Sequence, residues 1–212
     1  MQVAIALFPR LTALDAIGPY EVLQRVPELE PVFVAEQRGE VRTENGFLGL
    51  TADATFDEVT APDVVLVPGG VGTRAYVEGG PPVDWVRAVH PGTRFTTSVC
   101  TGSLVLGAAG LLDGRTATTH WSVLPMLEKL GAIPVGERVV EHLDDRVITA
   151  AGVSAGIDMA LRLVALLVDE TAARAAQLMI EYDPQPPFDA GHPSRVDAAV
   201  LLRAGQFAQV RA

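Results

Sequence analysis

The chain has 212 residues, of which 49% are hydrophobic and 20% charged, with 26 acidic against 16 basic residues and a net charge of −10. This composition predicts one globular domain over residues 1–212 with a sizeable core, and it argues against disorder. A chain this acidic repels phosphate groups, so we expect no nucleic-acid partner and no anionic membrane partner. No apolar run approaches the roughly 18 residues of a membrane span. The first nine residues lack the basic start of an export signal and indicate a first strand.

The single cysteine, Cys100, excludes an internal disulfide and any metal site built from several cysteines. A lone cysteine is typical of a reducing, cytoplasmic setting. The four histidines show no pair at metal-ligand spacing, so we expect neither a metal nor another cofactor.

Short β-branched segments alternate with longer helical segments along the chain. The predicted strands cover residues 2–7, 31–36, 63–67, 94–99 and 146–150, and the predicted helices cover residues 18–25, 83–89, 102–109, 123–130, 155–168 and 170–182. The strands are almost continuously apolar, as in parallel sheets that are covered on both faces. The alternation therefore predicts an α/β fold with a doubly wound, mostly parallel sheet between helices.

Two segments depart from this alternation. Residues 41–56 contain the hairpin signal Glu44-Asn45-Gly46 between short alternating segments, which predicts a β-ribbon excursion from the sheet. Residues 183–193 are too rich in proline for regular structure and predict an extended surface strap, followed by a last helix over residues 196–204.

The segment around Cys100 is the most informative for function. A strand ends at Val99 and a helix of small residues begins at Gly102, so that Cys100 stands where the chain must reverse. Ser98 and Gly102 are the small residues that such a nucleophile elbow requires two positions before and two positions after the nucleophile. The positive end of the helix dipole would favour the thiolate. The alternative interpretation is a buried structural cysteine.

A second strand runs into Gly69 and Gly70, which leaves backbone N–H groups clear of side chains. We interpret these residues as a backbone cradle for an oxyanion beside the nucleophile, the alternative being a simple turn. A dinucleotide site would require an acidic residue about 20 positions further on, at the end of the next strand, and none is present there.

Asp15 follows the loop after the first strand and precedes the predicted helix, whose entry is marked by Pro19. From the carboxyl edge of the sheet Asp15 could reach Cys100 and share a proton with it. The alternative is a helix cap or a surface acid. His120 and Trp121 follow a short strand and could line the same edge, although a structural histidine is the interpretation that we favour. Gly152 and Ser154 follow another strand, where Ser154 suits a helix N-cap and the glycine permits close approach of a ligand.

These segments resemble the ThiJ/PfpI superfamily, which shares the class I glutamine amidotransferase-like fold. Within it, they are most similar to bacterial isonitrile hydratases. The resemblance covers nearly the whole chain and is carried by Leu14-Asp15, Val67-Pro68-Gly69-Gly70, Ser98-Val99-Cys100-Thr101-Gly102-Ser103, Thr118-Thr119-His120-Trp121, Gly152-Val153-Ser154-Ala155-Gly156 and Glu181-Tyr182 with Pro186-Pro187-Phe188.

The resemblance implies a flavodoxin-like sandwich, a homodimer and a small isonitrile as the substrate. It implies Cys100 as the nucleophile, Asp15 as its acid/base partner and Thr101 as a further catalytic residue. Water would add to the isonitrile through a thioimidate on Cys100, giving an N-substituted formamide. Peptidase-like members carry histidine after the cysteine, where this chain has Thr101, and regulator members carry an added DNA-binding domain, for which we see no basic helical pair. The alternatives are a glyoxalase-like hydratase, a cysteine redox sensor or protective protein, and a binding domain without turnover.

Overall fold

The computed structural model describes residues 1–210, with side chains up to residue 207. The chain divides into two compact units, Met1–Ile180 and the residues from Glu181 onward, which are described separately. A single domain over residues 1–212 stays a prediction. No helix in the described part is long and apolar enough to cross a membrane.

A seven-stranded sheet forms the centre of the first unit. Its strand order is β10-β11-β7-β6-β1-β2-β5, and all neighbours are parallel except the β10–β11 pair. The bounds are β1 (Gln2–Ala6), β2 (Glu30–Ala35), β5 (Ala54–Thr55), β6 (Val64–Val67), β7 (Phe95–Val99), β10 (Val139–His142) and β11 (Val147–Ala150). Val67 of β6 pairs with Ser98 of β7, so the residues after these two strands lie side by side at one edge of the sheet.

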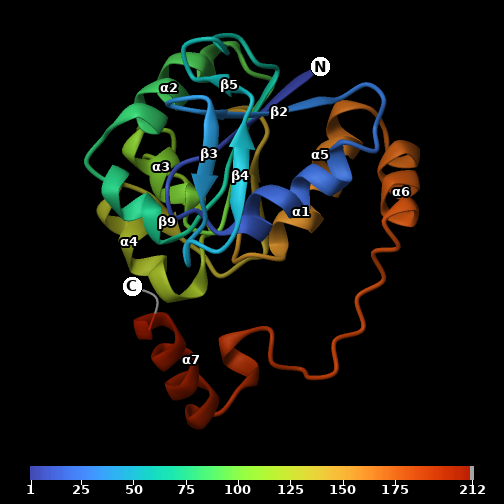
Figure 1. Ribbon diagram of the computed structural model, residues 1–212. Coiled ribbons are helices and arrows are strands. Elements are labelled where there is room, and N and C mark those ends of the chain that lie inside the picture. Colours follow the sequence, from blue (N-terminus) through green and yellow to red (C-terminus); the bar gives the residue numbers. More distant parts are fainter. Residues whose placement is uncertain (211–212) are drawn as a thin grey trace. The chain divides into compact units, whose positions relative to one another are not determined.

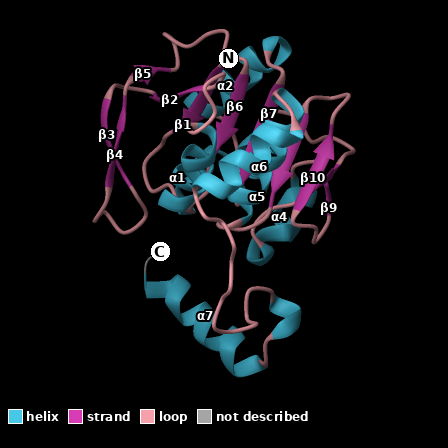
Figure 2. Cartoon of the chain, turned by 90° about the vertical axis from the view of Figure 1, so that its right-hand side faces the viewer, coloured by secondary structure: helices cyan, strands magenta, loops and turns pink. Residues whose placement is uncertain are grey.

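Helices cover both faces of this sheet (Figures 1 and 2). On one face lie α1 (Ala13–Leu23), α5 (Ala155–Leu167) and α6 (Glu170–Met179), with α5 packed against the other two. On the other face α2 (Pro81–Val89) packs against α3 (Gly102–Ala108), and α4 (Leu124–Lys129) packs beside α3. Coverage on both faces explains why every residue of β6 is buried and apolar.

The remaining elements of the first unit are short. An antiparallel hairpin is formed by β3 (Gly39–Arg42) and β4 (Gly49–Ala52), and β8 (Thr116–Ala117) pairs with β9 (Ile133–Pro134). Short 3-10 helices cover Val71–Tyr76, His90–Gly92 and Trp121–Val123. The hairpin confirms the predicted β-ribbon, and Thr43 at its turn forms a parallel bridge with Leu11.

The second unit holds a strap without regular structure, a 3-10 turn at Pro193–Arg195 and helix α7 (Ala198–Val210). The proline-rich strap is confirmed, and the last helix runs further than the predicted residues 196–204.

All five predicted strands are confirmed, whereas α1 begins five residues before its predicted start at residue 18. Pro19 therefore lies inside α1 and Asp15 in its first turn. A proline removes only one intrahelical hydrogen bond, and the burial of Pro19 and Val22 holds the helix in place. The sequence analysis missed β10 because it is an edge strand with polar residues, and it extended α6 to residue 182 although the helix ends at Met179.

Candidate active site

Cys100 occupies a sharp bend between β7 and α3, as the sequence predicted. Its φ angle is 55°, in the left-handed region, and its N–H donates to the carbonyls of Ala150 and Ala151, each at 3.0 Å. A methyl group on Gly102 would overlap the carbonyl oxygen of Val67, so the following helix can pack on β6 only with glycine there. The left-handed backbone of a non-glycine residue stores strain, which this framework of hydrogen bonds and close packing holds in place.

The Cys100 sulfur lies in an enclosed and polar environment. Only 4% of the residue is exposed, and the backbone amides of Thr101 and Val153 are close enough to act on the pKa of the thiol. Burial, and then the negative charge of Asp15, raise the pKa of the Cys100 thiol, while the two amides lower it to a smaller extent. Burial therefore opposes the resting thiolate that the helix end was expected to favour, and α3 is only seven residues long.

Asp15 comes from the first turn of α1 and is fully buried. Its Oδ2 accepts from the N–H of Gly69 at 2.9 Å, and its carboxyl interacts with the Cys100 thiol. Its Oδ1 is buried and has no hydrogen-bond partner among the described residues. Burial raises the pKa of Asp15 from 3.8 to about 7; the Gly69 amide and the thiol oppose this, and the charge of Glu44 adds to it. Asp15 and Cys100 thus lie together, and the carboxyl can gain or lose a proton near neutral pH.

The turn after β6 binds side chains of the protein itself. The N–H of Gly69 donates to Asp15, and the N–H of Gly70 donates to Thr101 Oγ1 at 2.8 Å. The Thr101 hydroxyl donates back to the Gly70 carbonyl at 3.0 Å. The prediction of a free oxyanion cradle at Gly69 and Gly70 therefore needs correction, because both amides are already occupied.

Gly69 and Gly70 are required for a steric reason. A methyl group on Gly69 would lie 2.5 Å from the Thr101 nitrogen and 2.8 Å from Asp15 Oδ2. Gly70 has φ 125°, a conformation that favours glycine. The turn thus passes so close to Asp15 and Thr101 that no side chain fits at Gly69.

The predicted pocket residues are only partly brought together. His120 packs against Gly152, where an added methyl group would lie 2.6 Å from its ring, and the His120 ring lies 5.4 Å from that of Trp121, between centroids. Burial lowers the pKa of His120, and the charge of Glu44 opposes this. His120 Nδ1 pairs with Ser122 Oγ at 2.8 Å, and no described hydrogen bond joins it to Cys100 or Asp15.

Ser154 stands apart from this group. It occupies the predicted N-cap position of α5, but its exposed hydroxyl makes no capping bond and instead accepts from Arg138 at 3.4 Å.

Two contributors to the site were missed by the sequence analysis. The backbone amide of Val153 lowers the pKa of the thiol, and its φ of 34° is a conformation for which a β-branched residue gives no sequence signal. Glu44 lies in the β3–β4 turn and accepts from the Val71 N–H at 3.2 Å. It belonged to the predicted hairpin signal, which indicated a turn and not a position near the site.

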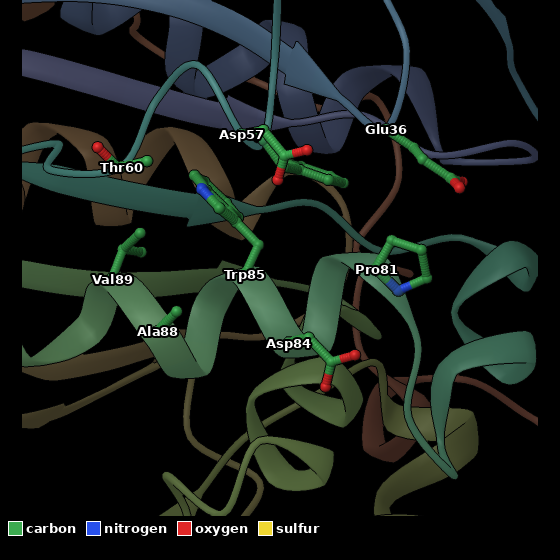
Figure 3. A pocket seen from close by; sticks show the side chains of 9 residues that line it. Glu36, Asp57, Thr60, Pro81, Asp84, Trp85, Ala88 and Val89 are labelled. Atoms are coloured by element: carbon green, nitrogen blue, oxygen red, sulfur yellow. The ribbon is translucent and has the colours of Figure 1, made fainter.

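Two open clefts lie elsewhere in the first unit. One, of about 500 Å³, lies between α2 and the segment after β5 and is lined by Trp85, Asp57 and Asp84 among others (Figure 3). The other, of about 450 Å³, is lined by residues that include Phe8 and Tyr76. Neither cleft contains Cys100, Asp15 or Thr101, so the candidate site is a separate, enclosed group of side chains.

A cysteine at a strand–turn–helix bend, next to a buried carboxyl at the carboxyl edge of a parallel sheet, defines the class of α/β proteins with a nucleophile elbow. The sequence profile of the DJ-1/PfpI family matches residues 1–166. The chain belongs to the DJ-1/PfpI family.

Three relatives illustrate this membership. The isonitrile hydratase of Pseudomonas putida is 44% identical over 204 residues, which cover 96% of this chain and 88% of that protein. The crystal structure of a ThiJ/PfpI family protein from Pseudomonas syringae superposes with a TM-score of 0.92 at 38% identity, covering 99% of this chain and 86% of the other. The HTH-type transcriptional regulator GbdR of Pseudomonas aeruginosa is 36% identical over 55% of this chain and 32% of its own length.

Proposed function

We propose that the protein is an isonitrile hydratase, which adds water to R–N≡C and releases the formamide R–NH–CHO. The likeness to the Pseudomonas putida enzyme over nearly the whole chain supports this activity. The contact between the Cys100 thiol and the Asp15 carboxyl, whose pKa lies at about 7, carries the proposal, because it supplies a nucleophile and a proton carrier at one point.

In the first proposed step the Cys100–Asp15 pair holds one proton. The thiol proton passes to the Asp15 carboxylate while the sulfur forms a bond to the terminal isonitrile carbon. Asp15 then delivers this proton to the same carbon, giving the thioimidate R–N=CH–S–Cys100 and a carboxylate. Transfer through Asp15 avoids a free thiolate or an unsolvated charged adduct in a buried site.

In the second proposed step the Asp15 carboxylate removes a proton from water as the water oxygen bonds to the thioimidate carbon. The proton moves to the substrate nitrogen, which leaves a tetrahedral adduct bearing S, OH and NH–R. The C–S bond breaks, the hydroxyl proton goes to Asp15, and the formamide departs. The pair again holds one proton, so the cycle balances as R–NC + H₂O → R–NH–CHO.

The backbone N–H groups of Thr101 and Val153 have a place in both steps. They lower the pKa of the thiol and so stabilise negative charge on the sulfur while the C–S bond forms and breaks. Thr101 has a second task, since its hydroxyl holds the Gly70 peptide and with it the turn that binds Asp15.

The test is direct. The purified protein is incubated with an alkyl or aryl isonitrile and formamide is followed by chromatography, with Cys100→Ala and Asp15→Asn measured beside it. Formamide from the wild type and from neither variant supports the proposal. An inactive wild type refutes it, and lactate formed from methylglyoxal instead would identify a glyoxalase-like hydratase.

The quaternary and cellular settings are part of the same proposal. A homodimer is supported by the family resemblance and by apolar side chains left exposed in the first unit, with Leu178 80% and Phe47 87% exposed. A cytoplasmic setting is supported by the reduced thiol that the reaction requires. Sedimentation velocity that shows only monomers would refute the dimer.

A further inference from the structure

Three successive backbone N–H groups of the turn after β6 are bound by three side chains from different parts of the chain. Gly69 donates to Asp15 of α1, Gly70 to Thr101 at the start of α3, and Val71 to Glu44 of the hairpin. Two of these acceptors already have roles in the proposed reaction. The third, Glu44, has no role in it.

Glu44 is held by its own backbone. Its N–H donates to the carbonyl of Leu11 at 3.1 Å, and Thr43 beside it is buried and forms a bridge with Leu11. The neighbouring loop residue Thr12 donates to the carbonyl of Gly69 at 2.9 Å and leads directly into α1. The hairpin, the loop before Asp15 and the 69–71 turn therefore form one continuous hydrogen-bonded unit.

We propose that Glu44 is a positioning residue of this site: its carboxylate holds the third amide of the turn and so keeps the two preceding amides directed at Asp15 and Thr101. In this interpretation the β3–β4 hairpin, which lies outside the main sheet, places the Glu44 carboxylate at the carboxyl edge of that sheet. The inference rests on the proposed function only for its activity readout.

The charge of Glu44 has a second effect. The titratable groups that act on Asp15 are the Cys100 thiol and Glu44, and the charge of Glu44 also acts on His120. Loss of this negative charge would therefore favour ionisation of Asp15 and shift its titration to lower pH. The effect of the Glu44 hydrogen bond and the effect of its charge can be measured separately, because glutamine at this position keeps an oxygen acceptor for the Val71 N–H while removing the charge.

The experiment compares Glu44→Gln, Glu44→Ala and the control Glu40→Ala, an exposed acid on the same hairpin. Asp15 is followed by infrared difference spectroscopy through the C=O stretch of its protonated carboxyl, with Asp15→Asn identifying the band. Steady-state turnover of an isonitrile and urea unfolding are measured on the same preparations.

For Glu44→Gln we expect a wild-type stretch frequency, the Asp15 titration moved down by about half a pH unit, and a smaller loss of kcat than in Glu44→Ala. For Glu44→Ala we expect a changed frequency, because the Gly69 hydrogen bond is perturbed, and a kcat lowered about ten-fold or more. Glu40→Ala should change neither. A Glu44→Ala protein with wild-type frequency and kcat overturns the inference, as does an equal loss in Glu40→Ala. If the infrared changes occur while the wild type turns over no isonitrile, the proposed function fails and the positioning role stands.

Discussion

Replacing Asp15 with asparagine should make the protein more stable and inactive at the same time. In the folded state the pKa of Asp15 is raised from 3.8 to about 7, chiefly by burial. Well below pH 4 the carboxyl is neutral in both the folded and the unfolded states, and the shift costs nothing. As the pH rises towards 7 only the unfolded state ionises, and stability falls until the folded carboxyl ionises as well. A shift of about three units corresponds to about 4 kcal/mol at higher pH.

Asparagine keeps the shape of the side chain and an oxygen acceptor for the Gly69 N–H, and it cannot ionise. We therefore expect Asp15→Asn to match the wild type at low pH and to exceed its free energy of unfolding by up to about 4 kcal/mol above pH 7. Loss of the proton carrier should lower kcat by about 10²- to 10⁴-fold.

Urea unfolding at about pH 4 and about pH 8.5 checks this prediction through the difference between the two proteins. Asp144→Asn, at an exposed aspartate, gives the background for losing one carboxyl. If the difference in free energy of unfolding between the wild type and Asp15→Asn does not change with pH, the argument that burial raises the pKa of Asp15 is refuted.

Three further predictions follow from the same contacts. For the wild type, kcat/KM should rise with an apparent pKa of about 7 as Asp15 loses its proton. Only then does the Cys100–Asp15 pair hold the single proton that the reaction requires. A pH profile of kcat/KM that is flat from about pH 5 to about pH 9 contradicts this prediction. Thr101→Val should lower the free energy of unfolding by about 1–3 kcal/mol, because it leaves the Gly70 N–H without its acceptor. Thr51→Val, at an exposed threonine of β4, should change it by no more than about 0.5 kcal/mol. Gly102→Ala should destabilise the protein by about 3 kcal/mol or more, because the Val67 carbonyl cannot move out of the sheet. Gly136→Ala, at a glycine in open space, should fold normally. Melting temperatures measure the Thr101 and Gly102 variants against their controls.

The sequence was sufficient for the parts of the fold that depend on local chemistry. Strands buried on both faces appear as continuous apolar segments, and all five central ones were found. The bend at Cys100 was predictable because a strand, a cysteine and a glycine-led helix leave a single place for the reversal. The neighbourhood of Asp15 and Cys100 followed from the rule that sites gather at the carboxyl edge of parallel strands.

The parts that failed depend on contacts between distant segments. Whether the amides of Gly69 and Gly70 are free is decided by Asp15 and Thr101, which lie 54 and 31 residues away in the chain. From the sequence alone Glu44 is only part of a predicted turn. Its position near the site depends on the bridge between Thr43 and Leu11. The resting state of the thiol depends on how deeply it is buried, and a motif gives no measure of depth.

The occupied amides of the 69–71 turn also bear on how the protein could be inhibited. Aldehydes and boronic acids block many hydrolases because the adduct's anionic oxygen is held by free backbone donors. Here the donors of this turn already serve the protein's own side chains, so such compounds should gain little from it. Small, uncharged, soft electrophiles that react with sulfur are the better starting point for a selective inhibitor.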